Sequence, residues 1–140
     1  MKEYIVNNID ETNKVAEDLV SKLKGKSVIA LSGNLGAGKT TFVKAIANKL
    51  GVEENVTSPT FVLIKLYNTK DEKIKKIIHV DCYRLDGKED LYEIGLEDYL
   101  EYKDSLVVIE WADKIVNLPD DIIKINIKII GENKRNIKIE

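Results

Sequence analysis

The sequence feature that most restricts how this chain can fold is a glycine-rich loop at residues 32–41, S-G-N-L-G-A-G-K-T-T. Gly33, Gly38, Lys39 and Thr40 satisfy the phosphate-loop pattern G-x-x-x-x-G-K-[ST]. Glycines let the backbone turn tightly, so that several N–H groups and the positive end of the following helix can surround a phosphate. The loop therefore predicts a nucleotide-binding protein.

The residues on both sides of the loop predict the strand and the helix that such a motif needs. Residues 28–31, V-I-A-L, form an apolar run typical of a buried strand, and residues 42–50 carry apolar side chains at helical spacing. Glycine-rich turns also connect strands to helices without binding phosphate, but here strand, full motif and helix coincide. In such a loop Lys39 reaches the β- and γ-phosphates and the Thr40 hydroxyl binds Mg²⁺.

Composition limits the size of the fold and its partners. A chain of 140 residues with 44% hydrophobic content predicts one domain, residues 1–140, with a single core. The formal net charge of −2 argues against a surface that binds nucleic acid on its own. Cys82 is the only cysteine, which excludes an intramolecular disulfide. With no signal peptide and no long apolar stretch, we expect a cytoplasmic protein without membrane contact.

The rest of the chain predicts an α/β fold with two antiparallel hairpins, the second of them C-terminal and at the rim of the sheet. The apolar run at residues 106–109 is typical of a central strand covered on both faces. Asn8 or Asp10 is expected to cap the first helix, which Gly25 ends. The predicted strands are residues 3–6, 28–31, 61–67, 74–83, 105–111, 122–130 and 136–140, and the predicted helices lie within residues 8–25, 42–50 and 85–103.

Two acids are candidates for the metal and the hydrolytic chemistry. Asp81 and Glu110 each end an apolar strand, and open α/β sheets bind ligands at the carboxyl ends of their strands. A phosphate loop that supports hydrolysis also needs acids to hold Mg²⁺ and to orient the attacking group. Either residue could bind the metal. The alternative for each is an exposed acid that ends its strand and has no role in the site.

Other polar and aromatic residues allow more than one interpretation. Residues 57–60, T-S-P-T, could sense the γ-phosphate as a switch loop or form an ordinary turn. Trp111 could cover a nucleotide, although burial is the usual place of a single tryptophan. His79 alternates with apolar residues on a strand and is interpreted as packing. Arg84 and Arg135, the only arginines, could each neutralise a phosphate or a carboxylate. The absence of an N-K-x-D segment favours ATP over GTP.

Six motifs together point to a family. In order, they are G-N-L-G-A-G-K-T-T, T-S-P-T-F, H-V-D-C-Y-R-L, E-I-G-L-E-D-Y-L, V-V-I-E-W-A-D-K and G-E-N-K-R. This succession, which spans most of the chain, resembles the TsaE (YjeE) ATPase family of bacterial tRNA threonylcarbamoyladenosine synthesis. The resemblance implies a three-layer, P-loop NTPase-like α/β fold with a mixed central sheet. It also implies action with TsaB and TsaD subunits in modifying adenosine 37 of ANN-decoding tRNAs, with TsaD performing the transfer and tRNA reached through the complex.

The same resemblance assigns roles to individual residues. It implies that Thr40 and Glu110 bind Mg²⁺, and that Asp81 acts in hydrolysis as a base or as the acid that orients water. We expect Lys39 and Glu110, together with Asp81, to be the catalytic residues. The implied ATP site consists of Thr12, Gly33, Leu35, Gly36, Ala37, Gly38, Lys39, Thr40, Thr41, Thr60, Trp111 and Arg135.

The sequence favours the hypothesis of a Mg²⁺-dependent ATP hydrolase that drives or resets a protein complex. A small-molecule kinase shares the loop and both acids, but it normally has an arginine-rich lid, and this chain has two arginines. A non-catalytic module, in which ATP merely orders residues 57–60 for a partner, is the second alternative. A weak intrinsic rate is expected, because no arginine lies in the proposed switch loop to stabilise the transition state.

Overall fold

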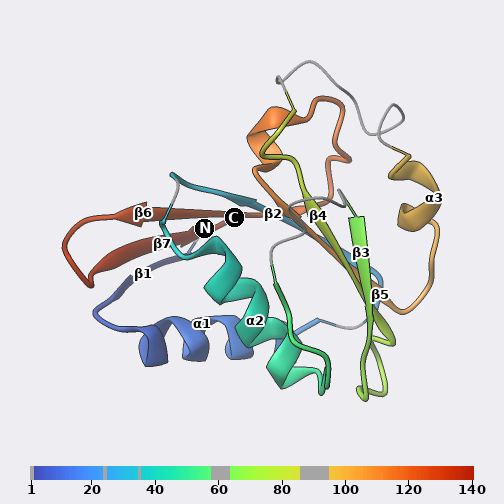
Figure 1. The fold of residues 1–140 in the computed structure, drawn as a ribbon, viewed down its shortest axis with the longest axis horizontal. Helices are drawn as coiled ribbons and strands as arrows, with labels where there is room; N and C mark the ends of the chain where they lie inside the picture. Colours follow the sequence, from blue (N-terminus) through green and yellow to red (C-terminus); the bar gives the residue numbers. More distant parts are fainter. Residues whose placement is uncertain (1, 24, 35, 58–63, 86–94) are drawn as a thin grey trace.

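The fold is known from a computed structural model that describes residues 2–23, 25–34, 36–57, 64–85 and 95–140 (Figure 1). Its elements, in chain order, are β1 (Lys2–Val6), α1 (Ile9–Ser21), β2 (Ser27–Ser32), α2 (Lys39–Lys49), β3 (Ile64–Asn68), β4 (Lys76–Asp81), α3 (Glu97–Leu100), β5 (Ser105–Glu110), the 3-10 turn η1 (Ala112–Lys114), β6 (Ile123–Ile129) and β7 (Arg135–Ile139).

The strands form one mixed sheet in the order β1-β7-β6-β2-β5-β4-β3. The four neighbours β6, β2, β5 and β4 are parallel, and the outer pairs β1–β7, β7–β6 and β4–β3 are antiparallel. Helices α1 and α2 pack together on one face of this sheet (Figure 1). Residues of α3, η1 and the segment after η1 pack on the opposite face of the central strands. The predicted three-layer α/β fold with a mixed sheet is confirmed.

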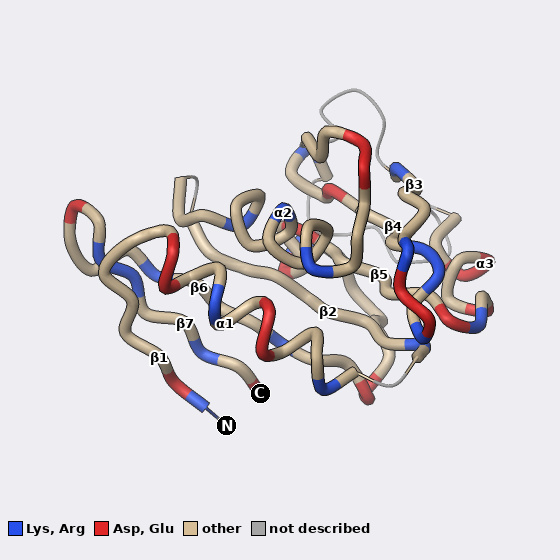
Figure 2. Tube along the Cα trace, turned by 90° about the horizontal axis from the view of Figure 1, so that it is seen from below, with Lys and Arg blue, Asp and Glu red and all other residues tan. Residues whose placement is uncertain are grey.

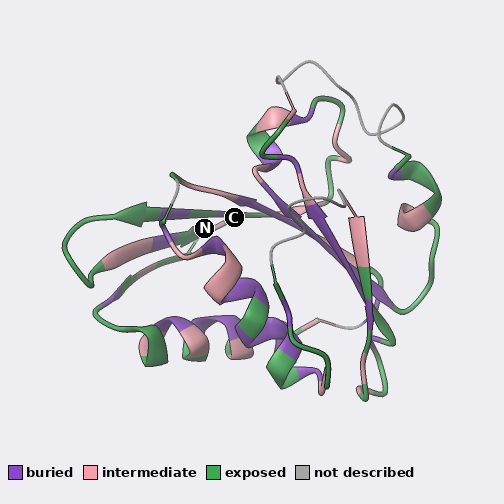
Figure 3. Ribbon diagram, viewed as in Figure 1, coloured by how far each residue is buried: buried purple, intermediate pink, exposed green. Residues whose placement is uncertain are grey.

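The core lies on both faces of β5, whose six residues are all buried (Figure 3). Leu106 and Val108 pack with the α1 and α2 side, whereas Val107 and Ile109 pack with the η1 and α3 side. The middle of a strand covered on both faces is apolar at consecutive positions, which explains why residues 106–109 show no alternation. The central strand predicted at residues 106–109 is therefore confirmed.

Helix α1 begins where the chain offers side-chain acceptors for its first N–H groups. The Asn8 side chain accepts a hydrogen bond from the Glu11 N–H at 2.9 Å, and the Glu11 carboxylate accepts one from the Asn7 N–H at 2.7 Å. These bonds satisfy donors that have no acceptor within the helix. Asn8, not Asp10, is therefore the N-cap. Both acidic and basic residues lie along the helix that follows (Figure 2).

Helix α2 begins at Lys39, three residues before the start predicted from its apolar spacing. Its N-cap is Gly38, with φ 106°, a backbone conformation that favours glycine. The residues Lys39, Thr40 and Thr41 therefore form the first turn, although their polarity resembles a loop. The free N–H groups of that turn point back toward the glycine-rich loop, which is the arrangement that binds anions.

The C-terminal hairpin is formed by β6 and β7, as predicted, but its predicted position at the rim of the sheet is wrong. Strand β1 pairs antiparallel with β7 over its whole length, from Lys2 opposite Ile139 to Val6 opposite Arg135. The N-terminal strand thereby takes the edge and encloses the hairpin between itself and β2.

Two other predictions are confirmed only in part. The hairpin of β3 and β4 is present, but residues 58–63 lie outside the described part, and β3 is described from Ile64. Of the two short helices predicted within 85–103, α3 is described and residues 86–94 fall outside the described part. In the parts of the chain that the structure describes, no helix has the length and apolar content needed to cross a membrane.

Candidate functional site

The glycine-rich loop closes tightly against the C-terminal hairpin. Gly33 has φ 147°, and a Cβ added there would lie 2.4 Å from the main-chain oxygen of Ile127 in β6. Only glycine allows this approach without moving the backbone. The loop is thus held at a fixed position between β2, α2 and β6, with the first turn of α2 facing its interior.

Lys39 is buried at the centre of the loop, with 5% of its surface exposed. Its Nζ donates hydrogen bonds to the main-chain oxygens of Gly33 at 2.6 Å and Asn34 at 2.9 Å, and it lies 4.0 Å from the centre of the Trp111 ring. Burial lowers the pKa of Lys39, and the negative charges of Glu110, Asp113 and Asp81 oppose that shift. The lysine is therefore a desolvated cation whose charged form is stabilised by three nearby acids.

The carboxylate of Glu110 meets the first turn of α2. Glu110 is 2% exposed, and its Oε1 accepts a hydrogen bond from the Thr40 hydroxyl at 3.1 Å. Asp81 is the register partner of Glu110 across the parallel β4–β5 ladder, is half-buried, and accepts the Tyr83 N–H at 2.9 Å. The two acids thus end neighbouring strands next to the loop. A hydroxyl and carboxylates are the hard oxygen ligands that Mg²⁺ prefers, so the residues present fit this ion.

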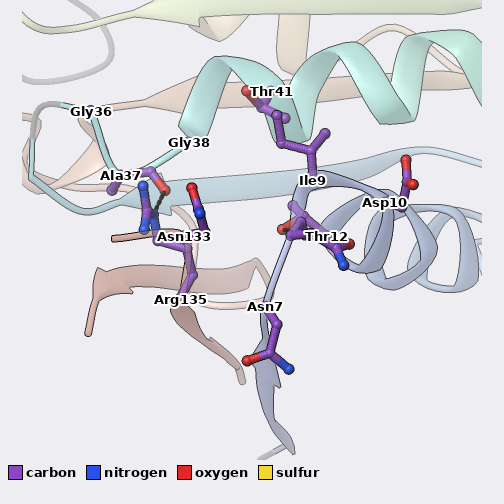
Figure 4. Close-up of a pocket in the computed structure, with 11 residues that line it drawn as sticks. Asn7, Ile9, Asp10, Thr12, Gly36, Ala37, Gly38, Thr41, Asn133 and Arg135 are labelled. Carbon is purple, nitrogen blue, oxygen red and sulfur yellow. Dashed lines mark hydrogen bonds between the residues drawn. The ribbon is translucent and has the colours of Figure 1, made fainter. Parts of the chain in front are cut away.

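A pocket of 480 Å³ opens on the other side of the loop, between the N-terminus of α1 and the C-terminal hairpin (Figure 4). Its walls come from three segments that are distant in the sequence. The Arg135 Nε donates a hydrogen bond to the Ala37 oxygen at 3.2 Å and so ties β7 to the loop (Figure 4). The lining residues are Asn7, Asn8, Ile9, Asp10, Thr12, Gly36, Ala37, Gly38, Thr41, Asn133 and Arg135.

The structure brings most of the residues expected in the site to one region. Thr12 and Arg135 line the same pocket as four residues of the loop segment, Gly36, Ala37, Gly38 and Thr41. Five other expected residues gather at the first turn of α2: Lys39, Thr40, Asp81, Glu110 and Trp111. Leu35 and Thr60 lie outside the described residues.

Trp111 adopts a left-handed backbone conformation with φ 58° and is half-buried. The centre of its ring lies 4.0 Å from the Lys39 Nζ and 5.1 Å from the centre of the Tyr83 ring. A non-glycine residue with such a φ is uncommon and is concentrated at functional sites. The side chain packs against the core cluster on the η1 side of the sheet and also contacts the Lys39 ammonium, so it has features of both interpretations that the sequence allows.

Sequence reasoning missed a contact of His79. The interpretation of this residue as packing is incomplete: the side chain is fully buried, but its Nε2 lies 2.5 Å from Glu110 Oε2. Alternation along the strand places His79 on the same face as Asp81, but the contact with Glu110 depends on the pairing of β4 with β5. Asp113, three residues after Glu110, was also missed as a charge that acts on Lys39.

The fold and the loop geometry together define an α/β protein of the P-loop NTPase-like class. Comparisons with known proteins place it more narrowly. Residues 6–137 match the family model described as threonylcarbamoyl adenosine biosynthesis protein TsaE. The chain belongs to this family, and is thus a protein of threonylcarbamoyladenosine biosynthesis in tRNA.

Individual relatives agree over nearly the whole length. The tRNA threonylcarbamoyladenosine biosynthesis protein TsaE of Aquifex aeolicus is 41% identical over 142 residues, which cover 99% of this chain and 96% of that protein. The protein of the same name from Bacillus subtilis is 37% identical over 131 residues, 93% of this chain and 79% of that protein. The crystal structure of YdiB from Bacillus subtilis superposes with a TM-score of 0.80 at 32% identity, covering 99% of this chain and 83% of that one.

Proposed function

We propose that this chain binds ATP with Mg²⁺ and hydrolyses it slowly, and that this turnover serves a complex with TsaB-like and TsaD-like subunits that modifies adenosine 37 of ANN-decoding tRNAs. The observation that carries the proposal is the contact between the Thr40 hydroxyl and the buried Glu110 carboxylate, next to Lys39 at the start of α2. Family membership supports the tRNA pathway, and the site geometry supports the chemistry.

The phosphate loop supplies the binding energy for the nucleotide. Lys39 now donates to two neutral main-chain oxygens, those of Gly33 and Asn34. Phosphate oxygens would replace them with charged acceptors, and charge-assisted hydrogen bonds are roughly twice as strong as neutral ones. The N–H groups of the first turn of α2 face the same place. A di- or triphosphate therefore compensates for the burial of this lysine.

Thr40 and Glu110 would hold the metal. Mg²⁺ in nucleotide sites is usually bound by one or two carboxylate or hydroxyl oxygens together with phosphate oxygens, and this pair supplies such oxygens from α2 and β5. When bound, the ion would neutralise charge that develops on the phosphates during transfer. The protein's own part is to keep the Glu110 carboxylate buried and in contact with the Thr40 hydroxyl.

The pocket beside α1 would take the nucleoside. It adjoins Gly36, Ala37 and Gly38, so a nucleotide with its phosphates in the loop can extend into it. Thr12 and Asn133 offer polar contacts from opposite walls, and Arg135 adds a cation anchored to the Ala37 oxygen. A volume of 480 Å³ falls in the range of about 300–1,000 Å³ found for small-molecule sites.

Asp81 would orient or deprotonate the attacking water. It ends β4 beside Glu110, and its charge acts on Lys39, so it faces the region where the γ-phosphate would lie. The rate is expected to be low in the isolated chain. An arginine finger contributes about 10³ to 10⁵ in rate, and Arg135 is hydrogen-bonded to the oxygens of Ala37, Gly131 and Lys134.

Phosphate release by the isolated chain and by its mixture with TsaB-like and TsaD-like subunits tests the proposal. Slow release is expected from the wild type, with none from Lys39→Ala, which also loses ATP binding, whereas Asp81→Asn should bind ATP and release no phosphate. Phosphate transfer to an added acceptor in place of free phosphate would favour a kinase. Full tRNA modification by Asp81→Asn without turnover would leave only a nucleotide-dependent binding module.

A further inference from the structure

His79 lies directly beneath the proposed metal site. It is fully buried on β4, on the sheet face that α2 covers, and its Nε2 lies 2.5 Å from Glu110 Oε2. The other carboxylate oxygen, Oε1, accepts the hydrogen bond of the Thr40 hydroxyl. The two oxygens of one buried carboxylate are therefore held separately, one by β4 and the other by α2.

The imidazole makes this one hydrogen bond and no second one among the described residues. Its Nδ1 is buried without a partner there, as is the hydroxyl of Tyr67, whose ring centre lies 6.5 Å from that of His79. A buried polar group costs free energy unless it is hydrogen-bonded. Ile77, on the same face of β4, and Val108, the register partner of His79 on β5, are buried aliphatic residues, so an aliphatic side chain suits this environment. The contact with Glu110 is therefore the feature that distinguishes histidine from an aliphatic residue here.

The direction of the bond follows from the two groups. A carboxylate oxygen accepts hydrogen bonds, so the ring N–H that makes the contact is on Nε2. This bond fixes the rotation of the Glu110 carboxylate about its last torsion, which is otherwise broad. With Oε2 turned toward His79, Oε1 must face Thr40.

We propose that His79 is a positioning residue that sets the orientation of the Glu110 carboxylate and thereby prepares the Thr40–Glu110 pair to bind Mg²⁺. The inference rests on the proposed function, because it concerns the metal of the same site. It predicts a specific defect: loss of the His79 bond weakens Mg²⁺ binding and leaves the phosphate loop intact. Replacing such supporting partners of metal ligands typically lowers metal affinity by about 10- to 100-fold.

Two amide variants separate the Nε2 contact from the bulk of the ring. His79→Gln can place an amide N–H near the position of Nε2, whereas the shorter His79→Asn places one near Nδ1 and cannot reach Glu110. Tyr67→Phe is the matched control, since it removes an equally buried polar atom beside the same ring. The readout is the Mg²⁺ concentration that gives half of the metal-dependent gain in binding of a fluorescent ATP analogue.

His79→Asn should raise that midpoint about 10- to 100-fold, with binding of the analogue in EDTA unchanged. His79→Gln should restore most of the loss, and Tyr67→Phe should match the wild type. A wild-type midpoint in His79→Asn, or a defect in His79→Gln as large as in His79→Asn, would overturn the positioning role. If the wild type itself shows no Mg²⁺-dependent gain, the proposed metal site fails instead.

A second measurement needs no variant and so does not depend on whether the substitutions fold. His79 is the only histidine, so the imidazole nitrogen signals of the ¹⁵N-labelled wild type belong to it alone. In the ADP-bound protein we expect one protected Nε2–H signal that shifts when Mg²⁺ is added. A ring without a proton on Nε2, or a signal indifferent to Mg²⁺, would contradict the inference.

Discussion

Replacing Gly33 by alanine would test whether the phosphate loop is held against the C-terminal hairpin as the structure shows. Gly33 has φ 147°, and the new Cβ would lie 2.4 Å from the oxygen of Ile127, a main-chain atom that cannot rotate away. Either the loop or β6 must move. We therefore expect Gly33→Ala to destabilise the protein and to weaken ATP binding together.

The size of the effect follows from two contributions. A side chain in a left-handed backbone conformation costs about 1–2 kcal/mol, and forcing an extra carbon into a packed contact costs about 1–3 kcal/mol more. The sum, about 2–5 kcal/mol, is a large part of the stability of about 5–15 kcal/mol that native proteins have. Gly36→Ala supplies the matched control, because Gly36 has φ 80° but no contact within 4 Å of the added Cβ from the described residues beyond its chain neighbours.

Urea denaturation followed by circular dichroism gives the free energy of unfolding of each variant. Gly36→Ala should lose about 1–2 kcal/mol, and Gly33→Ala should lose clearly more. If Gly33→Ala cost no more than Gly36→Ala, the close approach of the loop to Ile127 would be refuted, and with it the fixed position of the loop.

Three further predictions concern the pocket, the core and the charge of the loop. Arg135→Ala removes the hydrogen bond to Ala37 and should weaken ATP binding about 10-fold in a calorimetric titration. Ile109→Ala, at a fully buried position of β5, should lower the free energy of unfolding in urea by about 2–5 kcal/mol. Burial lowers the pKa of Lys39, while a bound phosphate favours its charged form, so ATP binding should take up protons at pH values between the lowered pKa of the free protein and the higher pKa in the ATP complex. Titrations in buffers with different ionisation enthalpies measure this uptake, and its absence would contradict the burial argument.

The sequence predicts much of this fold because its signals are local. The apolar run of β5 and the glycine-rich loop each depend on residues close together in the chain, and both lie where their patterns indicate. The order of strands is not local. The hairpin of β6 and β7 was expected at the rim, but β1 pairs with β7 and so joins the two ends of the chain. The alternation of residues in either strand does not show which strand it pairs with.

In the candidate site, too, the local features were predictable from the sequence and the non-local contacts were not. The loop motif predicts Lys39 and Thr40, and the strand-end rule predicts two acids near them, whereas the side-chain contacts depend on the register of β4 and β5. His79 illustrates this. Its alternation on β4 is typical of a packing residue, and only the neighbouring strand brings Glu110 within 2.5 Å of it. Such contacts come from tertiary structure and leave no periodicity in the sequence.

The most direct test of the central claim compares ATP binding with and without Mg²⁺ in the wild type and in Glu110→Gln, by calorimetric titration. The substitution keeps the size of the side chain that contacts Thr40 and removes its charge. The wild type should bind ATP more tightly with Mg²⁺, and Glu110→Gln should match it in EDTA but gain nothing from the metal. A wild type that binds no ATP, or a variant with the full Mg²⁺ gain, would contradict the proposed site.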